Sequence, residues 1–191
     1  MKKLVLLFTT LVLSACASVS QGDLVNLAPT STLSPSKVAE GKTFTLTSQD
    51  VRNAQYVAVI KTDGEEQAEP LHARQNVRKA YESAIYQQFF SQGFNMTNSS
   101  NNIVNVQVVD ALATINQEPV KYTIDAKVTL KVTAETPTGK FVRTYTASGN
   151  NQGTFVADTT DVDAVINRVS SRVLNTIAQD QELLNYMKGN F

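Results

Sequence analysis

One cysteine stands out among the few residues of this sequence that could do chemistry. Cys16 is the only cysteine, and it ends the motif Leu13-Ser14-Ala15-Cys16. A branched apolar residue followed by two small residues and a cysteine is typical of a lipobox, in which a peptidase cuts before the cysteine and its sulfur receives a diacylglyceryl group. Two or more acyl chains hold a protein stably at a membrane. We therefore expect Cys16 to be lipidated.

The segment before Cys16 supports this interpretation. Lys2 and Lys3 give a positive start, and residues 4–13 form an apolar run broken only by two threonines. As a helix this run would be about 15 Å long, half the thickness of a bilayer core, which is typical of a signal peptide and too short for a membrane span. Ordinary secretory cleavage at Ala15-Cys16-Ala17 is the alternative, but an unpaired cysteine at this position favours the lipobox. Because Ala17 and not aspartate follows the cysteine, we expect the outer membrane, facing the periplasm.

Two further groups of residues could in principle support catalysis, and neither has the required surroundings. His72 is the only histidine, and no Gly-x-Ser-x-Gly motif accompanies it. A Ser-His-Asp triad needs the histidine held between a nucleophile and a carboxylate, so we expect His72 to be solvated or to lie at a helix start. Glu65, Glu66 and Glu69 form a polar loop that we interpret as solvated. We therefore predict no enzyme and no catalytic residue.

The aspartates near residue 160 suggest a helix start and not a metal site. Asp158, Asp161 and Asp163 lack the glycine and the terminal glutamate of an EF-hand calcium loop. Thr160 and Asp163 instead have the spacing of a capping box, and acidic residues in a first helical turn interact favourably with the helix dipole. We predict neither a metal nor a cofactor.

The charge balance argues against a nucleic-acid partner. The 191 residues contain 17 basic and 17 acidic side chains, and loss of Lys2 and Lys3 with the signal peptide leaves 15 basic side chains and a net charge of −2. Proteins that bind nucleic acids usually need a basic face, and no cluster of lysines or arginines provides one. The expected partners are the membrane, through the acyl chains on Cys16, and an envelope protein or the cell wall.

Hydrophobic periodicity predicts the elements that would position any site. We expect strands over 43–47, 54–60, 103–114, 120–135 and 140–148, a helix over 73–92, and a second helix over 161–178 that can continue to 187. A β-bulge is expected where the apolar phase slips at Val109. The fold class predicted is α+β, a mostly antiparallel sheet with two helices on one face. The last helix should pack through Val165, Val169 and Val173 on the sheet face that bears Ile124, Val128 and Val132.

The predicted organisation has three parts. Residues 1–15 are a lipoprotein signal peptide. Residues 16–42 contain the acylated cysteine and, because they are rich in serine, threonine and proline, a flexible tether. Residues 43–191 form a single α+β periplasmic domain.

Four residues are candidates for partner binding. Tyr86 and Phe90 lie one turn apart, opposite the main apolar stripe of the first helix. Exposed aromatic residues there would form a partner-binding patch, but we favour the interpretation that the C-terminal helix covers them. Asp50 and Arg52 follow the first strand, where a charged pair could orient a partner.

The chain resembles the YajG-type family of uncharacterised envelope lipoproteins over most of its mature domain. The resemblance is carried by Leu13-Ser14-Ala15-Cys16, Asp50-Val51-Arg52, Gln92-Gly93-Phe94, Lys121-Tyr122-Thr123-Ile124 and Ile177-Ala178-Gln179-Asp180. It implies an outer-membrane location and no established activity, and it transfers no catalytic residue.

Two functions follow as hypotheses. The first is a non-enzymatic interaction or structural module of the cell envelope, anchored in the outer membrane. The alternative is a lipid or glycolipid carrier, or an assembly-factor lipoprotein, with an apolar pocket. An enclosed apolar pocket of several hundred cubic ångströms would favour the carrier. A filled core with exposed aromatic surface would favour the interaction module.

Overall fold

The computed structural model describes residues 24–191, so Cys16 and the predicted signal peptide lie outside the described residues. The elements in chain order are β1 (Thr43–Asp50), β2 (Ala58–Thr62), β3 (Glu69–Leu71), α1 (Val77–Ser91), β4 (Asn95–Met96), β5 (Ile103–Gln117), β6 (Lys121–Thr136), β7 (Gly139–Thr154), α2 (Thr159–Gln179) and α3 (Gln181–Asn190). All the predicted strands and helices are present, although the second strand begins at residue 58 and not at 54.

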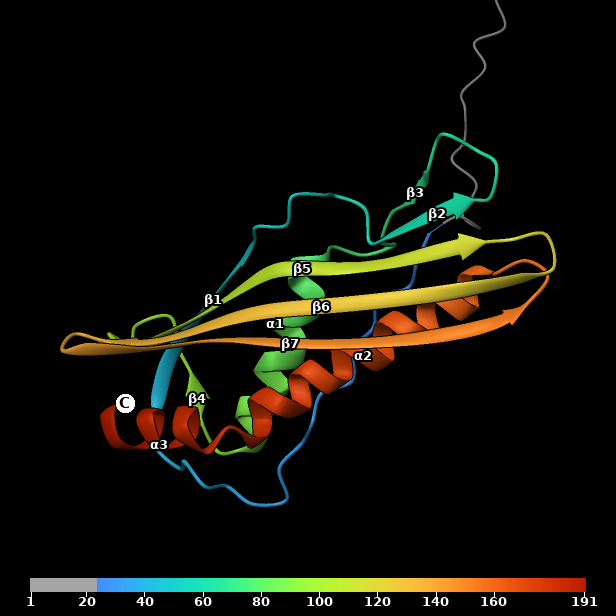
Figure 1. The fold of residues 1–191 in the computed structure, drawn as a ribbon. Helices are drawn as coiled ribbons and strands as arrows, with labels where there is room; N and C mark the ends of the chain where they lie inside the picture. The colour runs from blue at the N-terminus through green and yellow to red at the C-terminus, as the bar shows by residue number, and fades with distance from the viewer. Residues whose placement is uncertain (1–23) are drawn as a thin grey trace, which may run out of the picture.

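The sheet is mixed, with β5 at its centre (Figure 1). On one side β5 pairs with β6 and β6 with β7, all antiparallel. On the other side the first half of β5 pairs with β1 and its second half with β2, both parallel. The predicted α+β class is confirmed, but the mostly antiparallel sheet is wrong. The reason is that α1 lies between β2 and β5 in the chain, and such a crossover returns the chain in a parallel direction.

Helices cover one face of this sheet and leave the polar face of β5–β7 without a helix of the described chain (Figure 1). Val165, Val169 and Val173 of α2 are fully buried, as are the predicted partners on β6. A side chain at Gly149 would place a Cβ 2.9 Å from Val169 Cγ2, so glycine allows α2 to approach β7 closely. The β-bulge also lies where predicted, between Val108 and Asp110.

A third helix corrects the prediction of two. Asp180 ends α2 and also caps α3, because its Oδ1 accepts from the backbone N–H groups of Glu182 at 2.9 Å and Leu183 at 3.1 Å. The backbone of Asp180 is extended, which breaks the helical path. The expected continuation to Met187 therefore forms, but in a new direction.

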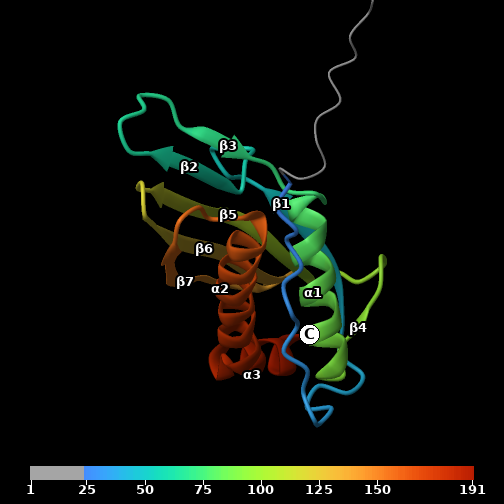
Figure 2. The same ribbon diagram turned by 90° about the vertical axis from the view of Figure 1, so that its right-hand side faces the viewer.

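Residues 24–34 form an extended segment, here called the strap, that lies between α1 and α2 (Figure 2). Val25 and Leu27 are fully buried. Val25 also bridges to Ala73, next to the start of α1. The prediction of a flexible tether is therefore wrong for residues 24–42, whereas residues 16–23 lie outside the described part. None of the helices described is long and apolar enough to cross a membrane.

Candidate functional site

The outer surface of α1 carries the exposed aromatic residues. Asn76 caps the helix start by accepting from the backbone N–H of Lys79 at 3.1 Å. The helix ends at Ser91, and Gly93 follows the cap residue with a φ of 97°, which is easily adopted only by glycine. The main stripe buries Tyr81, Ile85 and Phe89 against the sheet, and this fixes which residues of α1 face outward.

Tyr86 and Phe90 lie on that outward surface and form what we call the aromatic ridge. Their side chains are 45% and 57% exposed, and their rings are parallel to within 6° with centroids 6.1 Å apart. The expectation that the C-terminal helix covers them is wrong. Tyr86 lies on the side of α1 toward Leu46 of β1 and Met96 of β4, whereas α2 and the strap lie on the other side of α1 (Figure 2).

A groove of ≈ 510 Å³ borders the ridge on the side of β1 and β4. Its apolar wall consists of Tyr86, Leu46 and Met96, and its polar rim includes Lys79, Glu82 and Asn98. Glu82 is fixed by Arg78, at 2.5 Å, and by the hydroxyl of Ser48. The groove therefore combines an apolar floor with a small number of oriented polar groups, which is the usual composition of a binding surface.

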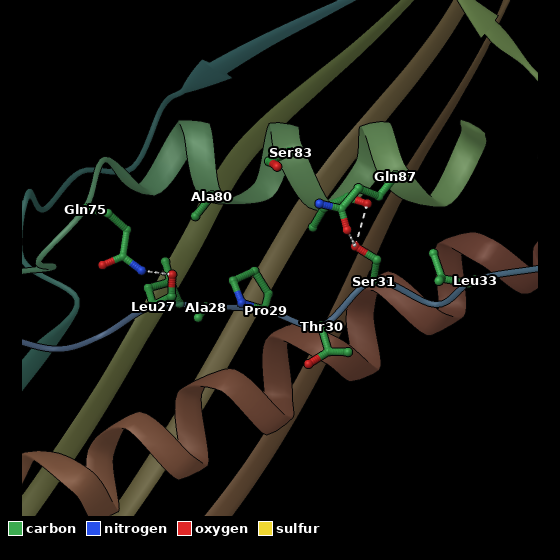
Figure 3. A pocket seen from close by; sticks show the side chains of 11 residues that line it. Leu27, Ala28, Pro29, Thr30, Ser31, Leu33, Gln75, Ala80, Ser83 and Gln87 are labelled. Atoms are coloured by element: carbon green, nitrogen blue, oxygen red, sulfur yellow. Dashed lines mark hydrogen bonds between the residues drawn. The ribbon is translucent and has the colours of Figure 1, made fainter. Parts of the chain in front are cut away.

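A second groove, of ≈ 430 Å³, lies on the opposite side of α1, against the strap (Figure 3). The Ser31 hydroxyl donates to the backbone oxygen of Ala84 at 3.0 Å and to Gln87 Oε1 at 3.3 Å. Leu33, which is 63% exposed, lines this groove near Gln87. Leu33 is not among the predicted site residues, because residues 16–42 were predicted to form a tether. The alternation of apolar Val25 and Leu27 with polar Asn26 is a short signal for the strap.

The structure brings Asp50 and Arg52 together as a mostly buried clamp, not as a freely exposed pair. Nε and Nη2 of Arg52 donate to the two carboxylate oxygens of Asp50, each at 2.9 Å, and Nη1 donates to the Tyr56 backbone oxygen at 3.0 Å. The Arg52 side chain is only 5% exposed. Burial would raise the pKa of Asp50, but hydrogen bonds and charge from Arg52 outweigh it and hold that pKa below its usual value. The pair therefore fixes the segment between β1 and β2.

The remaining candidate residues have structural or solvated surroundings. His72 is exposed, and so are Glu65, Glu66 and Glu69. The capping box at the start of α2 is formed by Asp158 and Asp161, not by Thr160 and Asp163 as predicted. Asp163 instead accepts from the backbone N–H of Asn26 in the strap, at 2.8 Å. Within residues 24–191 no group of three or more histidine, cysteine or acidic side chains is arranged to hold a metal.

These features define a class of fold, a mixed sheet with helices packed on one face and an N-terminal segment laid between two of them. A crystal structure of a protein from Xanthomonas campestris has a similar fold, with a TM-score of 0.54 and 12% sequence identity over 86% of this chain and 98% of that chain.

The sequence comparisons identify the family. Residues 29–188 match the family model described as "Uncharacterized lipoprotein". The uncharacterised lipoprotein YajG of Escherichia coli strain K12 is 26% identical over 172 residues, which cover 87% of this chain and 86% of YajG. The chain therefore belongs to this family of uncharacterised lipoproteins, and the resemblance recognised in the sequence is confirmed.

Proposed function

We propose that this lipoprotein is a non-enzymatic docking module of the cell envelope, anchored to the outer membrane through acyl chains on Cys16. Its partner is an envelope protein that presents an apolar segment to the aromatic ridge and to the neighbouring groove. Family membership supports a lipid anchor, and Ala17 after the cysteine supports the outer membrane.

The single observation that carries this proposal is the exposure of Tyr86 and Phe90 as a parallel pair beside a groove with an apolar wall. Aromatic side chains are enriched among the residues that dominate binding energy. The two rings already pack on each other, so little side-chain freedom remains to be lost on binding. Leu46 and Met96 at the base of the groove extend the apolar area that a partner could cover.

The carrier hypothesis receives less support from the interior of the domain. The space between sheet and helices is filled by fully buried side chains such as Phe44, Phe89 and Leu174. The two grooves beside α1 open to solvent on the surface of the domain, whereas a lipid carrier needs a cavity that encloses most of its ligand. The filled core and the exposed ridge are the combination that favours docking.

The proposal is tested by replacing both ridge residues, Tyr86→Ala with Phe90→Ala, in the acylated protein. We expect partners captured by in-cell crosslinking and mass spectrometry to be lost. The free energy of unfolding should change by no more than about 0.5 kcal/mol, because exposed substitutions away from special features rarely cost more.

The matched control is Lys127→Ala with Lys131→Ala, on the polar face of β6. Flexible lysines are depleted from interface cores, so this variant should keep its partners. Crosslinks that survive the ridge substitutions, or that disappear only with the lysine substitutions, would refute the assignment. A large loss of stability in the ridge variant would show instead that both rings belong to the core.

A further inference from the structure

A second exposed apolar cluster lies far from the ridge and is left unexplained by docking. Val120, Phe155 and Val156 are 68%, 72% and 75% exposed, the highest values among the exposed large hydrophobic side chains of the described chain. The Phe155 backbone N–H donates to the Val120 backbone oxygen at 3.0 Å, so the β5–β6 turn and the residues after β7 are joined. We call these three residues the apolar tip; the β5–β6 turn and the end of β7 lie at one end of the sheet (Figure 1).

The tip is held in place by the partly buried side chain of Gln117. Its Nε2 donates to the backbone oxygens of Phe155 at 2.6 Å and Glu118 at 2.8 Å, and its Oε1 accepts from the Ala157 N–H at 3.2 Å. Phe155 has a φ of 67°, a left-handed conformation that is unfavourable for a bulky side chain. Because backbone strain of this kind is concentrated at functional sites, the exposed phenyl ring indicates a binding surface.

The direction of the strap shows at which end of the domain the described chain begins. Backbone N–H groups of Asn26, Ala28 and Thr30 bond to Asp163, Asn167 and Ser171 of α2 in turn. Followed backwards, the chain therefore approaches the start of α2, which comes directly after the tip. The first described residue, Leu24, leads toward Cys16 from this end of the molecule.

The length of the connection keeps this end near the membrane. Seven residues, 17–23, separate Cys16 from Leu24. Even fully extended, the eight steps between these two residues reach no more than about 28 Å. The 16 residues of β7 alone extend about 53 Å along the sheet. The link is therefore shorter than the sheet is long, which favours the end that bears the tip as the one nearest to a lipid anchor at Cys16.

We infer that the apolar tip rests in the membrane interface and orients the domain so that the aromatic ridge faces away from the lipid. The inference depends on one part of the proposed function, namely that Cys16 is acylated.

The charges around the tip favour a zwitterionic lipid surface such as phosphatidylethanolamine. The neighbouring β2–β3 loop carries Glu65 and Glu66, and Lys121 beside the tip is paired with Glu118 at 3.4 Å. No polybasic cluster is present to draw the tip to anionic lipid.

The test uses the absence of tryptophan from the sequence, which makes a single introduced indole a unique reporter. The mature chain is anchored to phosphatidylethanolamine vesicles through its native acyl chains, or through a maleimide lipid coupled to Cys16. In the Phe155→Trp variant we expect the emission to shift to shorter wavelength and to be quenched by brominated lipid. The matched control is Phe90→Trp on the ridge, which should show neither effect. Added phosphatidylglycerol should not increase the shift.

Three outcomes would overturn the inference. Quenching of Phe90→Trp but not of Phe155→Trp would reverse the orientation, and quenching of neither would place the domain away from the lipid. A Phe155→Trp shift that appears without vesicles as protein concentration rises would make the tip a contact between copies of the chain. The maleimide anchor separates the two proposals, because it loads the membrane even if Cys16 is never acylated in the cell. Loss of crosslinked partners in the Tyr86→Ala, Phe90→Ala variant tests the docking proposal and does not depend on the fluorescence result.

Discussion

At the scale of single residues, ion pairs stabilise the irregular parts of this fold more than they create sites. Asp50 and Arg52 hold the segment after β1. Arg143 of β7 bonds at 2.8 Å to Asp180, the residue between α2 and α3. Tyr145 also donates to Asp180, at 2.6 Å. Burial opposes ionisation of Asp180, but these partners hold its pKa below the usual value. Both carboxylates therefore remain charged where their partners need them.

Replacing Asp50 with asparagine should destabilise the fold by about 1–3 kcal/mol, because the nearly buried Arg52 loses its charged acceptor. The folded pKa of Asp50 is lowered, so its contribution is present above the unfolded pKa, about 3.9, and is lost as the pH falls through the folded value. The difference in unfolding free energy between wild type and Asp50→Asn should thus be full near neutral pH and shrink below about pH 4.

Urea denaturation across this pH range measures the effect. Asp125→Asn is the control, since Asp125 is exposed on the polar face of β6 and forms none of the ion pairs found in the described chain. A difference between Asp50→Asn and wild type that stays constant with pH would contradict the clamp.

At the scale of elements, the strap is held by a ladder of polar side chains along one side of α2. Asp163, Asn167 and Ser171 are spaced four apart, and each accepts from a backbone N–H of the strap. This spacing repeats nearly one helical turn, while the strap offers outward N–H groups at every second residue. Asn167 is the middle of these three residues and makes a second bond to the strap: its Nδ2 donates to the Asn26 backbone oxygen at 2.8 Å.

Asn167→Ala should therefore release the middle of the strap. We expect faster amide hydrogen exchange at Asn26, Ala28 and Thr30, and a loss of about 1–3 kcal/mol, because two backbone groups lose their partner. Asn175→Ala is the matched control, since its contact with the Thr32 hydroxyl is long, at 3.4 Å. Equal exchange in the two variants would show that burial of Val25 and Leu27 alone holds the strap.

At the scale of the whole molecule, the proposals give the domain two ends with different roles. The apolar tip lies toward the end where the described chain begins at Leu24, and the ridge lies in the second half of α1, beyond the first strap residues along the chain. In this arrangement the lipid anchor fixes position, and the ridge remains available to a partner. The polar face of β5–β7 would remain in contact with solvent.

Replacing Cys16 with serine should move the protein from the membrane fraction to the soluble fraction without changing its melting temperature. The acyl chains are proposed to attach only at Cys16, and the core lies within residues 24–191. Membrane flotation, intact mass and thermal melting measure the three properties. A Cys16→Ser protein that still floats and carries lipid would show that the anchor is misassigned.

The sequence by itself determined the features that depend on local pattern. Strict alternation over β6 placed Ile124, Val128 and Val132 in the core, and the stripe of α2 identified Val165, Val169 and Val173 as their partners. The lipobox suggested the family, which the comparisons confirm. These signals succeed because burial repeats with the period of a strand or of a helix.

Only the tertiary structure decided the remaining features, because they depend on contacts between segments far apart in the chain. Strand direction required knowing that β1 and β2 share one edge of β5. The strap is held by side chains about 140 residues away, beyond the reach of any local pattern. Exposure of Tyr86 and Phe90 depended on α2 packing on the other side of α1, where Tyr81 bonds to Ser170. Sequence periodicity states which residues are apolar, whereas the neighbours that cover them are set by the fold.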